Sequence, residues 1–488
     1  MSDVAGTFLS DESGIRGEAD RIVFVNSKEE IARIFADGGH WTIQGAQTGI
    51  SGAAVPNGGG ICNCSKWSGV LQTGMLEETY FIDVLPGTTL QELKKAIPRG
   101  WFFPVDPTED SATIGGMFAT NAAGPCAFYY GRMSDWVLES DVFFPSFGWM
   151  TVKRGECLFS VQGEVHLPDG ACLKTEPVPD ERYIEQLLPK AGMDLLELLA
   201  GSEGMLGVLG RIRLRLERQF QERWSIVCFF DGDKNAFAFS DGIGKLFEKN
   251  PDCHLLALDF LGEKSIANYR KYAGEITAYR DIPELSKDFS AVMAEFSSNE
   301  PQVIEELIGD LFAWIEECGG SDENTWAADT EEEREKIRKF RHAVSACINE
   351  KITENRSRCP AVTKLSVDAA CGSRKPQDMF DCLEQMVKAA EHAVIIHMGT
   401  GIFHIDFFAK TQKEWRQAME IRERIFDLFT EPGGTIAAEN GVGKGKRSCL
   451  QRMISPGQKN TAEQVKGFFD RERQCNPGNG VCYRSVYK

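Results

Sequence analysis

The residues from Asp106 to Gly124 read DPTEDSATIGGMFATNAAG. They form the centre of a longer apolar segment, 102–137, which glycines and small residues interrupt. A similar glycine-bearing turn interrupts the apolar run LLAGSEGMLGVLGRIRLRL, Leu198–Leu216. Because glycine adopts backbone conformations that other residues avoid, these positions indicate tight turns between buried elements.

A third glycine-rich stretch, TIQGAQTGISGAAVPNGGG, covers Thr42–Gly60 and follows an expected strand. Small residues in such a loop allow backbone N–H groups to approach a pyrophosphate closely. The stretch matches neither the G-x-G-x-x-G dinucleotide motif nor the G-x-x-x-x-G-K-[ST] phosphate motif. Taken alone, it is equally compatible with a flexible surface loop.

The composition is that of a globular protein with more than one domain. The chain has 488 residues, 42% of them hydrophobic and 26% charged, and no apolar run is long enough for a membrane span. The N-terminal sequence lacks the basic and apolar regions of a secretory signal, so we expect a cytoplasmic protein. A net charge of −18 argues against nucleic-acid partners and requires a local basic pocket for any anionic substrate.

The cysteines indicate thiols. Their number, 15, is odd, and they show no C-x2-C-x2-C run that would hold an iron–sulfur cluster. Any iron–sulfur centre that takes electrons from this protein is therefore expected on a partner.

The order of elements predicts an α+β protein. RIVFVN predicts a strand, SKEEIARIFADGG a helix that begins at Ser27, and HWTIQG the next strand. The segment 138–163 resembles an inserted hairpin. Near residue 217 the pattern changes to long helices, 300–318 and 330–350, and we place a domain boundary there.

Two of the seven histidines, His397 and His404, flank the expected tight turn MGTGIF. Two strands joined by this turn would bring the imidazoles together, and strand periodicity places Ile402, His404 and Asp406 on one face. Two imidazoles and a carboxylate such as Glu439 are a common set of ligands for a divalent metal. The alternative is that the histidines are structural.

The run DP-x4-ATIGG-x3-TNA-x-G, with DESGIRGEADRIVFVNSKEEI near the start and CNPGNG near the end, resembles the vanillyl-alcohol oxidase and p-cresol methylhydroxylase superfamily. Within it, the chain is similar to the branch of D-lactate dehydrogenases, the glycolate oxidase flavoprotein subunit and D-2-hydroxyglutarate dehydrogenase. The resemblance implies a two-part FAD-binding domain at 1–217 and 451–488, the segment 138–163 being inserted. An α+β substrate (cap) domain at 218–450 would carry the metal site.

The same resemblance implies which residues bind FAD, without a covalent bond. The pyrophosphate would lie on the loop after the second strand, where the family usually has Arg-Gly-Gly-Gly-Thr and this chain lacks the arginine. Three further segments would surround the flavin and the adenine. The expected residues are Gln44, Gly45, Ala46, Gln47, Thr48, Gly49, Ser51, Gly52, Asp106, Ser111, Thr113, Gly115, Gly116, Asn121, Gly124, Glu203, Gly207 and Asn476.

The family motifs H-x-G-D-G-N-x-H and G-G-x-I-S-x-E-H-G-I-G-x-x-K stand here as HMGTGIFH and GGTIAAENGVGKGK. His397, His404 and Glu439 match the metal ligands, for zinc, manganese or iron. Asn440 replaces the histidine that the family uses as general base, and a carboxamide cannot accept the proton. We therefore expect Asp406 either to supply that function or to bind the metal. The alternative is that Asp406 is a solvent-exposed strand residue with no part in the reaction.

Arg341 and Lys364 are the candidates for binding the substrate carboxylate, although an isolated arginine on a charged helix is often a surface residue. The resemblance implies metal-assisted oxidation of a small, anionic D-2-hydroxy acid by hydride transfer to FAD. Electrons would pass to a protein, either an electron-transfer flavoprotein or an iron–sulfur subunit. The alternative is a flavin-binding subunit whose own site is silent or altered. An activity without net redox, as in the ether-lipid synthase of the superfamily, would need a histidine cluster that the loop around Asn440 lacks.

Overall fold

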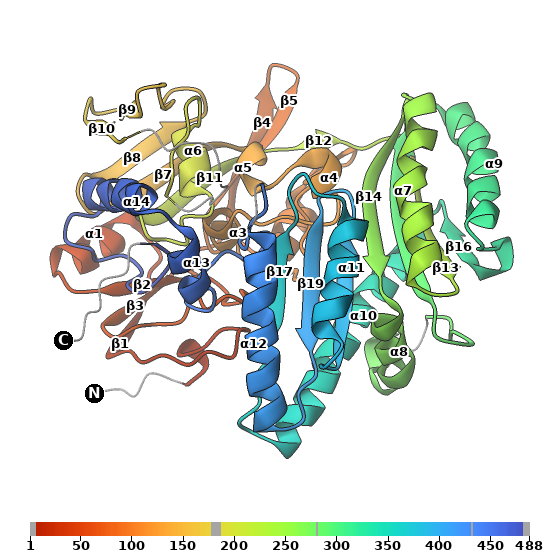
Figure 1. The fold of residues 1–488 in the computed structure, drawn as a ribbon. Coiled ribbons are helices and arrows are strands. Elements are labelled where there is room, and N and C mark those ends of the chain that lie inside the picture. Colours follow the sequence, from red (N-terminus) through yellow and green to blue (C-terminus); the bar gives the residue numbers. More distant parts are fainter. Residues whose placement is uncertain (1–5, 177–186, 280–281, 431–432, 482–488) are drawn as a thin grey trace. The chain divides into compact units, whose positions relative to one another are not determined.

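The computed structural model describes all residues except 1–5, 177–186, 280–281, 431–432 and 482–488 (Figure 1). The chain divides into two compact units. The first unit contains residues 1–124, 131–218 and 435–488, and the second contains residues 125–130 and 219–434.

The first unit begins with the strand–helix–strand order that the sequence predicts. β1 (Arg21–Phe24) is followed by α1 (Lys28–Ala36) and β2 (Trp41–Gln44). Ser27 caps α1 by accepting a hydrogen bond from the amide of Glu30, which confirms the predicted start of this helix. With β3 (Gly60–Asn63), these strands form a parallel sheet in the order β1-β3-β2. The glycine-rich loop therefore leaves the carboxyl end of β2 and crosses back to the start of β3.

Strands of the first unit also form a five-stranded antiparallel sheet, in the order β4-β5-β11-β7-β8, within the described residues. The segment expected as an inserted hairpin supplies β7 and β8, and β7 pairs with β11 in the interior of this sheet. The strands are β4 (Val70–Leu76), β5 (Thr79–Val84), β7 (Val137–Phe144), β8 (Gly148–Lys153) and β11 (Val208–Arg215), with the short pairs β6 (Trp101–Phe102) and β12 (Glu217–Arg218), and β9 (Glu164–His166) and β10 (Cys172–Lys174).

Short helices connect the strands of the first unit. α2 begins at the N-cap Thr89, which forms a capping box with Glu92. The helices are η1 (Gly6–Phe8), α2 (Leu90–Ala96), α3 (Ile114–Thr120), α5 (Met133–Trp136), α6 (Leu195–Leu199), α13 (Arg447–Met453) and α14 (Pro456–Phe469).

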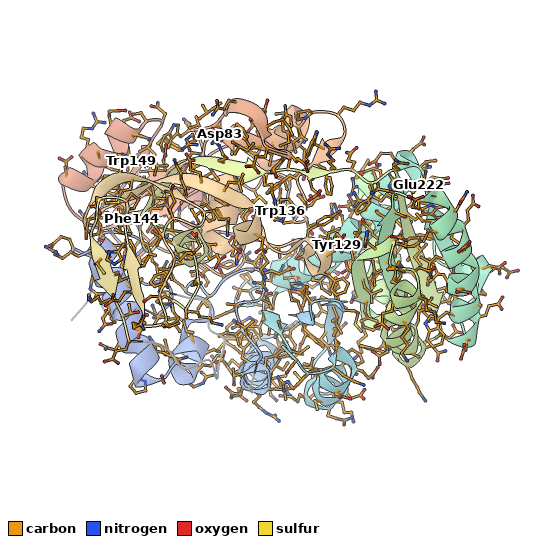
Figure 2. All side chains as sticks on the ribbon, turned by 90° about the horizontal axis from the view of Figure 1, so that it is seen from above. Asp83, Tyr129, Trp136, Phe144, Trp149 and Glu222 are labelled. Carbon is orange, nitrogen blue, oxygen red and sulfur yellow. The ribbon has the colours of Figure 1, made fainter. Side chains whose placement is uncertain are left out.

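The C-terminal part of the chain belongs to the first unit from Thr435 onward, whereas we expected the return at 451. One reason is that the loop after Thr435 is hydrogen-bonded to Glu203 and to Ser51 of this unit. In addition, Phe469 of α14 packs against Phe144, which Figure 2 labels on β7, with 4.6 Å between ring centroids.

The second unit is built on an antiparallel sheet of seven strands in the order β16-β13-β15-β14-β18-β19-β17, counted over its described residues. Most residues of these strands are buried, as expected for a sheet covered on both faces. They are β13 (Glu222–Phe230), β14 (Cys253–Leu261), β15 (Ser290–Ser298), β16 (Thr325–Ala328), β17 (Ser366–Ala370), β18 (His392–His397) and β19 (Ile402–Phe407).

Helices cover both faces of this sheet (Figure 1). One face carries α7 (Asp233–Lys249), α9 (Pro301–Glu317), α11 (Pro376–Val387) and α12 (Gln412–Phe429). The other carries α8 (Glu263–Tyr272), the short η2 (Ala273–Glu275) and η3 (Thr277–Tyr279), and α10 (Glu331–Arg358), with η4 (Asp322–Asn324) before β16. The long helices expected at 300–318 and 330–350 are thus present as α9 and α10. A large apolar core fills the space between α8, α10 and the sheet.

The segment 125–130, which includes α4 (Ala127–Tyr130), belongs to the second unit. The ring of Tyr129, labelled in Figure 2, lies 5.2 Å from the ring of His254 on β14 and 6.5 Å from that of Phe220. In the described part of the chain, no helix combines the length and the apolar character that crossing a membrane requires.

Candidate functional site

The loop that follows β2 has the features of an anion cradle. Within the described residues, none of the backbone amides from Gly45 to Ile50 donates a hydrogen bond to a carbonyl group. Ser51 is 2% exposed, and its hydroxyl has no hydrogen-bond partner in the described part of the chain. Since buried polar groups are normally paired, this hydroxyl and these amides are suited to a ligand rich in acceptor oxygens.

Glycine is required in this loop because other chain segments approach it closely. A Cβ atom on Gly45 would lie 2.2 Å from the side-chain oxygen of Thr113. Gly52 has a φ of +80°, and its Cβ would lie 2.9 Å from Ile15. Ala46, Thr48 and Gly49 lie between these positions and are partly or fully exposed.

The two glutamines of the loop hold it in place. The side chain of Gln44 is buried and donates to the carbonyls of Phe8 and Ala54 at 2.9 and 2.8 Å. Gln47, at a φ of 62°, donates to the carbonyl of Ser10 at 2.7 Å. Gln44, which stands where the family usually has an arginine, thus fixes the backbone of the loop. The part of this loop in binding the pyrophosphate stays a prediction.

The segment 106–124 forms a turn and the helix α3 beside this loop. Thr113 caps α3 by accepting from the amide of Gly116, and Asn121 ends the helix with a φ of 51°. The side chain of Asn121 also accepts from the amide of Ser134 at 3.0 Å. A Cβ on Gly115 would meet Pro86, and one on Gly124 would meet the backbone of Asp106. The expected residues of this segment are therefore turn and cap positions that pack closely.

Two other expected residues of this segment have local partners. The carboxylate of Asp106 accepts from Lys94 at 2.7 Å. Ser111 is exposed, and its hydroxyl donates to Glu109 at 2.6 Å. The part that these two side chains play toward FAD stays a prediction.

Glu203 joins the glycine loops of the first unit. Its carboxylate accepts from the amide of Val442 at 2.5 Å and from that of Gly443 at 3.0 and 2.9 Å. Burial raises the pKa of Glu203 above its ordinary value, although the two amides act in the opposite direction. Asn476 accepts from the amide of Ile43 at 2.5 Å and donates to the carbonyl of Glu203, and Gly207 packs against the carbonyl of Phe143. Glu203 and Asn476 therefore link β2 to the C-terminal part of the chain.

In the second unit, the two predicted metal-binding histidines lie together. His397 ends β18 and His404 lies in the middle of β19, and their ring centroids are 5.1 Å apart. The predicted hairpin is confirmed, because the two strands pair in antiparallel register with Ile402 opposite His397.

Each of these histidines has an aspartate beside it on the neighbouring strand. The Nδ1 atom of His397 lies 2.5 Å from Asp259 on β14, and that of His404 lies 3.9 Å from Asp368 on β17. The aspartates are 2% and 1% exposed. Four polar side chains thus form a row across four adjacent strands on the face that α10 covers.

Asp259 also binds Arg341 of α10, whose Nε donates to its second oxygen at 2.6 Å. Burial raises the pKa of Asp259, but its contacts with His397 and Arg341 outweigh this effect and lower the pKa to about 2. Asp259 was missed in the sequence analysis. The available signal was a single acid within the apolar strand HLLALDFL.

The other two predicted catalytic residues of this unit lie near the row but have their own partners. Asp406 is partly buried on β19 and accepts from the hydroxyl of Ser366, which stands opposite it on β17. Lys364 precedes β17, and its ammonium donates to Asn349 of α10 at 2.8 Å. Their catalytic roles stay predictions.

Glu439 and Asn440 belong to the first unit, in the loop before α13. Both are partly buried. Lys446 closes this loop by donating from its ammonium to the carbonyl of Ile436 at 2.7 Å. Because Glu439 lies in the other unit from the histidines, its place as a third metal ligand stays a sequence-based prediction.

The histidine pair fits a divalent metal by its chemistry. An ionised carboxylate only accepts hydrogen bonds, so Nδ1 of His397 carries the proton and Nε2 carries the lone pair. A carboxylate behind an imidazole is the arrangement that fixes a metal-binding histidine in proteins. His397 and His404 would hold the ion, with Asp259 and Asp368 supporting them.

Comparison with known proteins shows that two parts of the chain match families of FAD-dependent proteins. Residues 19–147 match the FAD binding domain family, and residues 247–479 match the family of FAD linked oxidases, C-terminal domain. The D-lactate dehydrogenase of Anaerostipes hadrus is 26% identical over 98% of this chain and 93% of its own. The D-2-hydroxyglutarate dehydrogenase of Stutzerimonas stutzeri is 24% identical over 89% of this chain and 84% of its own.

The structure of p-cresol methylhydroxylase matches the fold with a TM-score of 0.67, at 11% identity, over 96% of this chain and 89% of that one. The predicted α+β fold and the FAD-binding domain are thereby confirmed. The cradle after β2, the two family matches and the relatives agree that the chain belongs to the FAD-linked oxidases of the p-cresol methylhydroxylase and vanillyl-alcohol oxidase type, in the branch of 2-hydroxy-acid dehydrogenases.

Proposed function

We propose that the protein is a metal-assisted dehydrogenase of a small D-2-hydroxy acid. The observation that supports this most is the pair His397 and His404, each with an aspartate beside its Nδ1 atom. Two relatives, 26% and 24% identical to this chain, are named D-lactate dehydrogenase and D-2-hydroxyglutarate dehydrogenase. Glu439 is the third ligand that the family motif implies.

When bound, FAD would supply the acceptor for the hydride on C2 of such a substrate, and a divalent metal held by His397 and His404 would supply positive charge next to the substrate oxygen. The protein's own residues orient the reaction. Asp259 holds the imidazole of His397 in one tautomer, and Arg341 neutralises Asp259. Arg341 is the first candidate for binding the substrate carboxylate. Lys364 is the second candidate for this carboxylate.

The hydroxyl proton of the substrate needs an acceptor other than Asn440. We propose Asp406, two residues after His404 on the same face of β19. Its contact with Ser366 fixes the carboxylate on the strand. The alternative role for Asp406 is to bind the metal, and the two roles differ in whether its removal changes metal content.

The proposed reaction would need a protein acceptor for the electrons, which we propose to be an electron-transfer flavoprotein or an iron–sulfur subunit in the cytoplasm. A second candidate function is a flavin-binding subunit with a silent or altered site. Asn440, Thr400 and Ile402 favour it, because they replace family residues in the two motifs, whereas the histidine pair opposes it.

The test is to follow the flavin absorbance anaerobically while adding D-lactate, glycolate, D-malate and D-2-hydroxyglutarate one at a time. Reduction of the flavin by one of them supports the dehydrogenase and identifies its substrate. Bound flavin that none of them reduces, in protein whose metal content has been measured and restored, favours the silent subunit.

A further inference from the structure

A hollow of about 530 Å³ lies in the second unit, away from the histidine pair. Its walls come from α8, the last turns of α10, the start of β18 and Lys410 after β19. This volume is within the range of about 300 to 1,000 Å³ that is typical of small-molecule sites.

The hollow is distinct from the candidate metal site, although the same elements serve both. His392 in its wall begins β18, which ends at His397. Five residues of extended strand separate them by roughly 17 Å. Likewise α10 carries Arg341 at the metal site and Asn355 at the hollow, roughly 20 Å apart along the helix.

Positive charge dominates the lining. Five cations, Lys264, Lys271, Lys351, Arg358 and Lys410, face the hollow, together with two acids, Glu354 and Glu391. The lining thus has an excess of positive charge in a chain whose net charge is −18. Such a local excess attracts anions.

The cations share their acidic partners. Glu354 binds Arg358 at 2.5 Å and lies 3.9 Å from Lys271. Glu391 binds Lys351 at 2.5 Å and Lys410 at 2.7 Å. Each group of one carboxylate and two cations therefore has a net charge of +1, which an incoming anion can compensate.

A buried donor in the same wall lacks a partner. Asn355 is 3% exposed, and its Nδ2 atom has no hydrogen-bond partner among the residues that the structure describes. Leaving a buried donor unpaired costs about 1–3 kcal/mol, so a rotation of this amide that brings Nδ2 to an acceptor oxygen in the hollow would be favoured.

We propose that this hollow binds a small phosphorylated metabolite through its phosphate group. A phosphate monoester carries two negative charges and three acceptor oxygens, which match Lys271, Arg358 and the amide of Asn355. A ligand with a single carboxylate carries only one negative charge, so it would compensate only one of these two groups of charges. The remaining volume holds the organic part of the ligand, beside the ring of Tyr272.

Isothermal titration calorimetry of the FAD-loaded protein with inorganic phosphate and pyrophosphate tests this, at constant ionic strength. FAD must be bound, because the loop after β2 would otherwise accept pyrophosphate itself. We expect saturable binding of one equivalent, weakened about tenfold or more in the double variant Lys271→Gln, Arg358→Gln. Lys336→Gln removes one charge from α10 outside the hollow and should leave binding unchanged.

The variant Asn355→Leu tests the donor separately. It should fold at least as well as the wild type, because it removes a donor without a partner, yet bind phosphate more weakly. The proposal is overturned if the wild type shows no saturable binding, if Lys336→Gln weakens binding as much as the double variant, or if citrate binds and phosphate does not.

Discussion

His397 donates a hydrogen bond from Nδ1 to Oδ1 of Asp259 over 2.5 Å, while Arg341 holds the other oxygen of the same carboxylate. The three residues come from β18, β14 and α10, far apart in the sequence. This contact fixes the tautomer that presents Nε2 of His397 to a metal.

Asp259→Asn should therefore weaken metal binding. An amide at this position can turn either its donor or its acceptor toward Nδ1, so the imidazole loses its fixed tautomer, and Arg341 loses its ionic partner. We expect a loss of metal affinity of about 10- to 100-fold, measured by zinc titration with a competing chelator. Asp241→Asn, an exposed position on α7, is the matched control. Equal affinity in both variants would show that Asp259 has no part in metal binding.

Asp406→Asn separates the two roles proposed for this residue. The asparagine keeps an oxygen that can accept from Ser366, so the strand should stay intact. If Asp406 is the proton acceptor, turnover falls by about 10²- to 10⁴-fold at unchanged metal content. If it is a ligand, metal content falls as well. Unchanged turnover and unchanged metal content would exclude both roles.

The sequence predicts the local structure around the site well. Ser27 begins a helix where the capping pattern places it, and the turn MGTGIF brings His397 and His404 together. These features depend on residues close in the chain, whose geometry follows from periodicity and capping.

The surroundings of the site depend on strand order, which the sequence does not reveal. Asp259 stands next to His397 only because β14 pairs with β18, more than a hundred residues later. In the same way, Glu203 binds the loop at Val442 and Gly443 through a contact that no periodic pattern encodes. For this reason the aspartates beside the two histidines and the return of the chain at Thr435 were found only in the structure.

Gly45→Ala should destabilise the protein and weaken FAD binding. The new methyl group would lie 2.2 Å from the oxygen of Thr113 that caps α3, so the cap and the loop must move apart. We expect a loss of about 1–3 kcal/mol in the free energy of unfolding. In Gly49→Ala the methyl group meets no protein atom within 4 Å, so the apoprotein should keep its stability. Urea unfolding of both apoproteins checks this, and equal stability would contradict the close packing at Gly45.

Lys444 should make the stability of the apoprotein depend on pH. Burial lowers its pKa to about 8, although Glu203 and Asp11 raise it, whereas the unfolded chain titrates at the ordinary value of 10.5. Between these values the unfolded chain binds more protons than the folded protein, so the free energy of unfolding should rise with pH. Thermal unfolding from pH 8 to pH 10 measures this rise, and Lys444→Met should remove it. A variant that shows the same rise as the wild type would contradict the assignment.

Asn440→His tests whether the site has lost only its base. An imidazole with a pKa near neutrality can accept the hydroxyl proton that a carboxamide cannot. We expect faster flavin reduction by the substrate found in the anaerobic assay, with a new dependence on pH near neutrality, whereas Asn440→Ala should show neither. If Asp406 already serves as the base, the gain should be small in the wild-type background and large in Asp406→Asn. A histidine that gives no gain in either background would mean that the site has diverged at more than this one position.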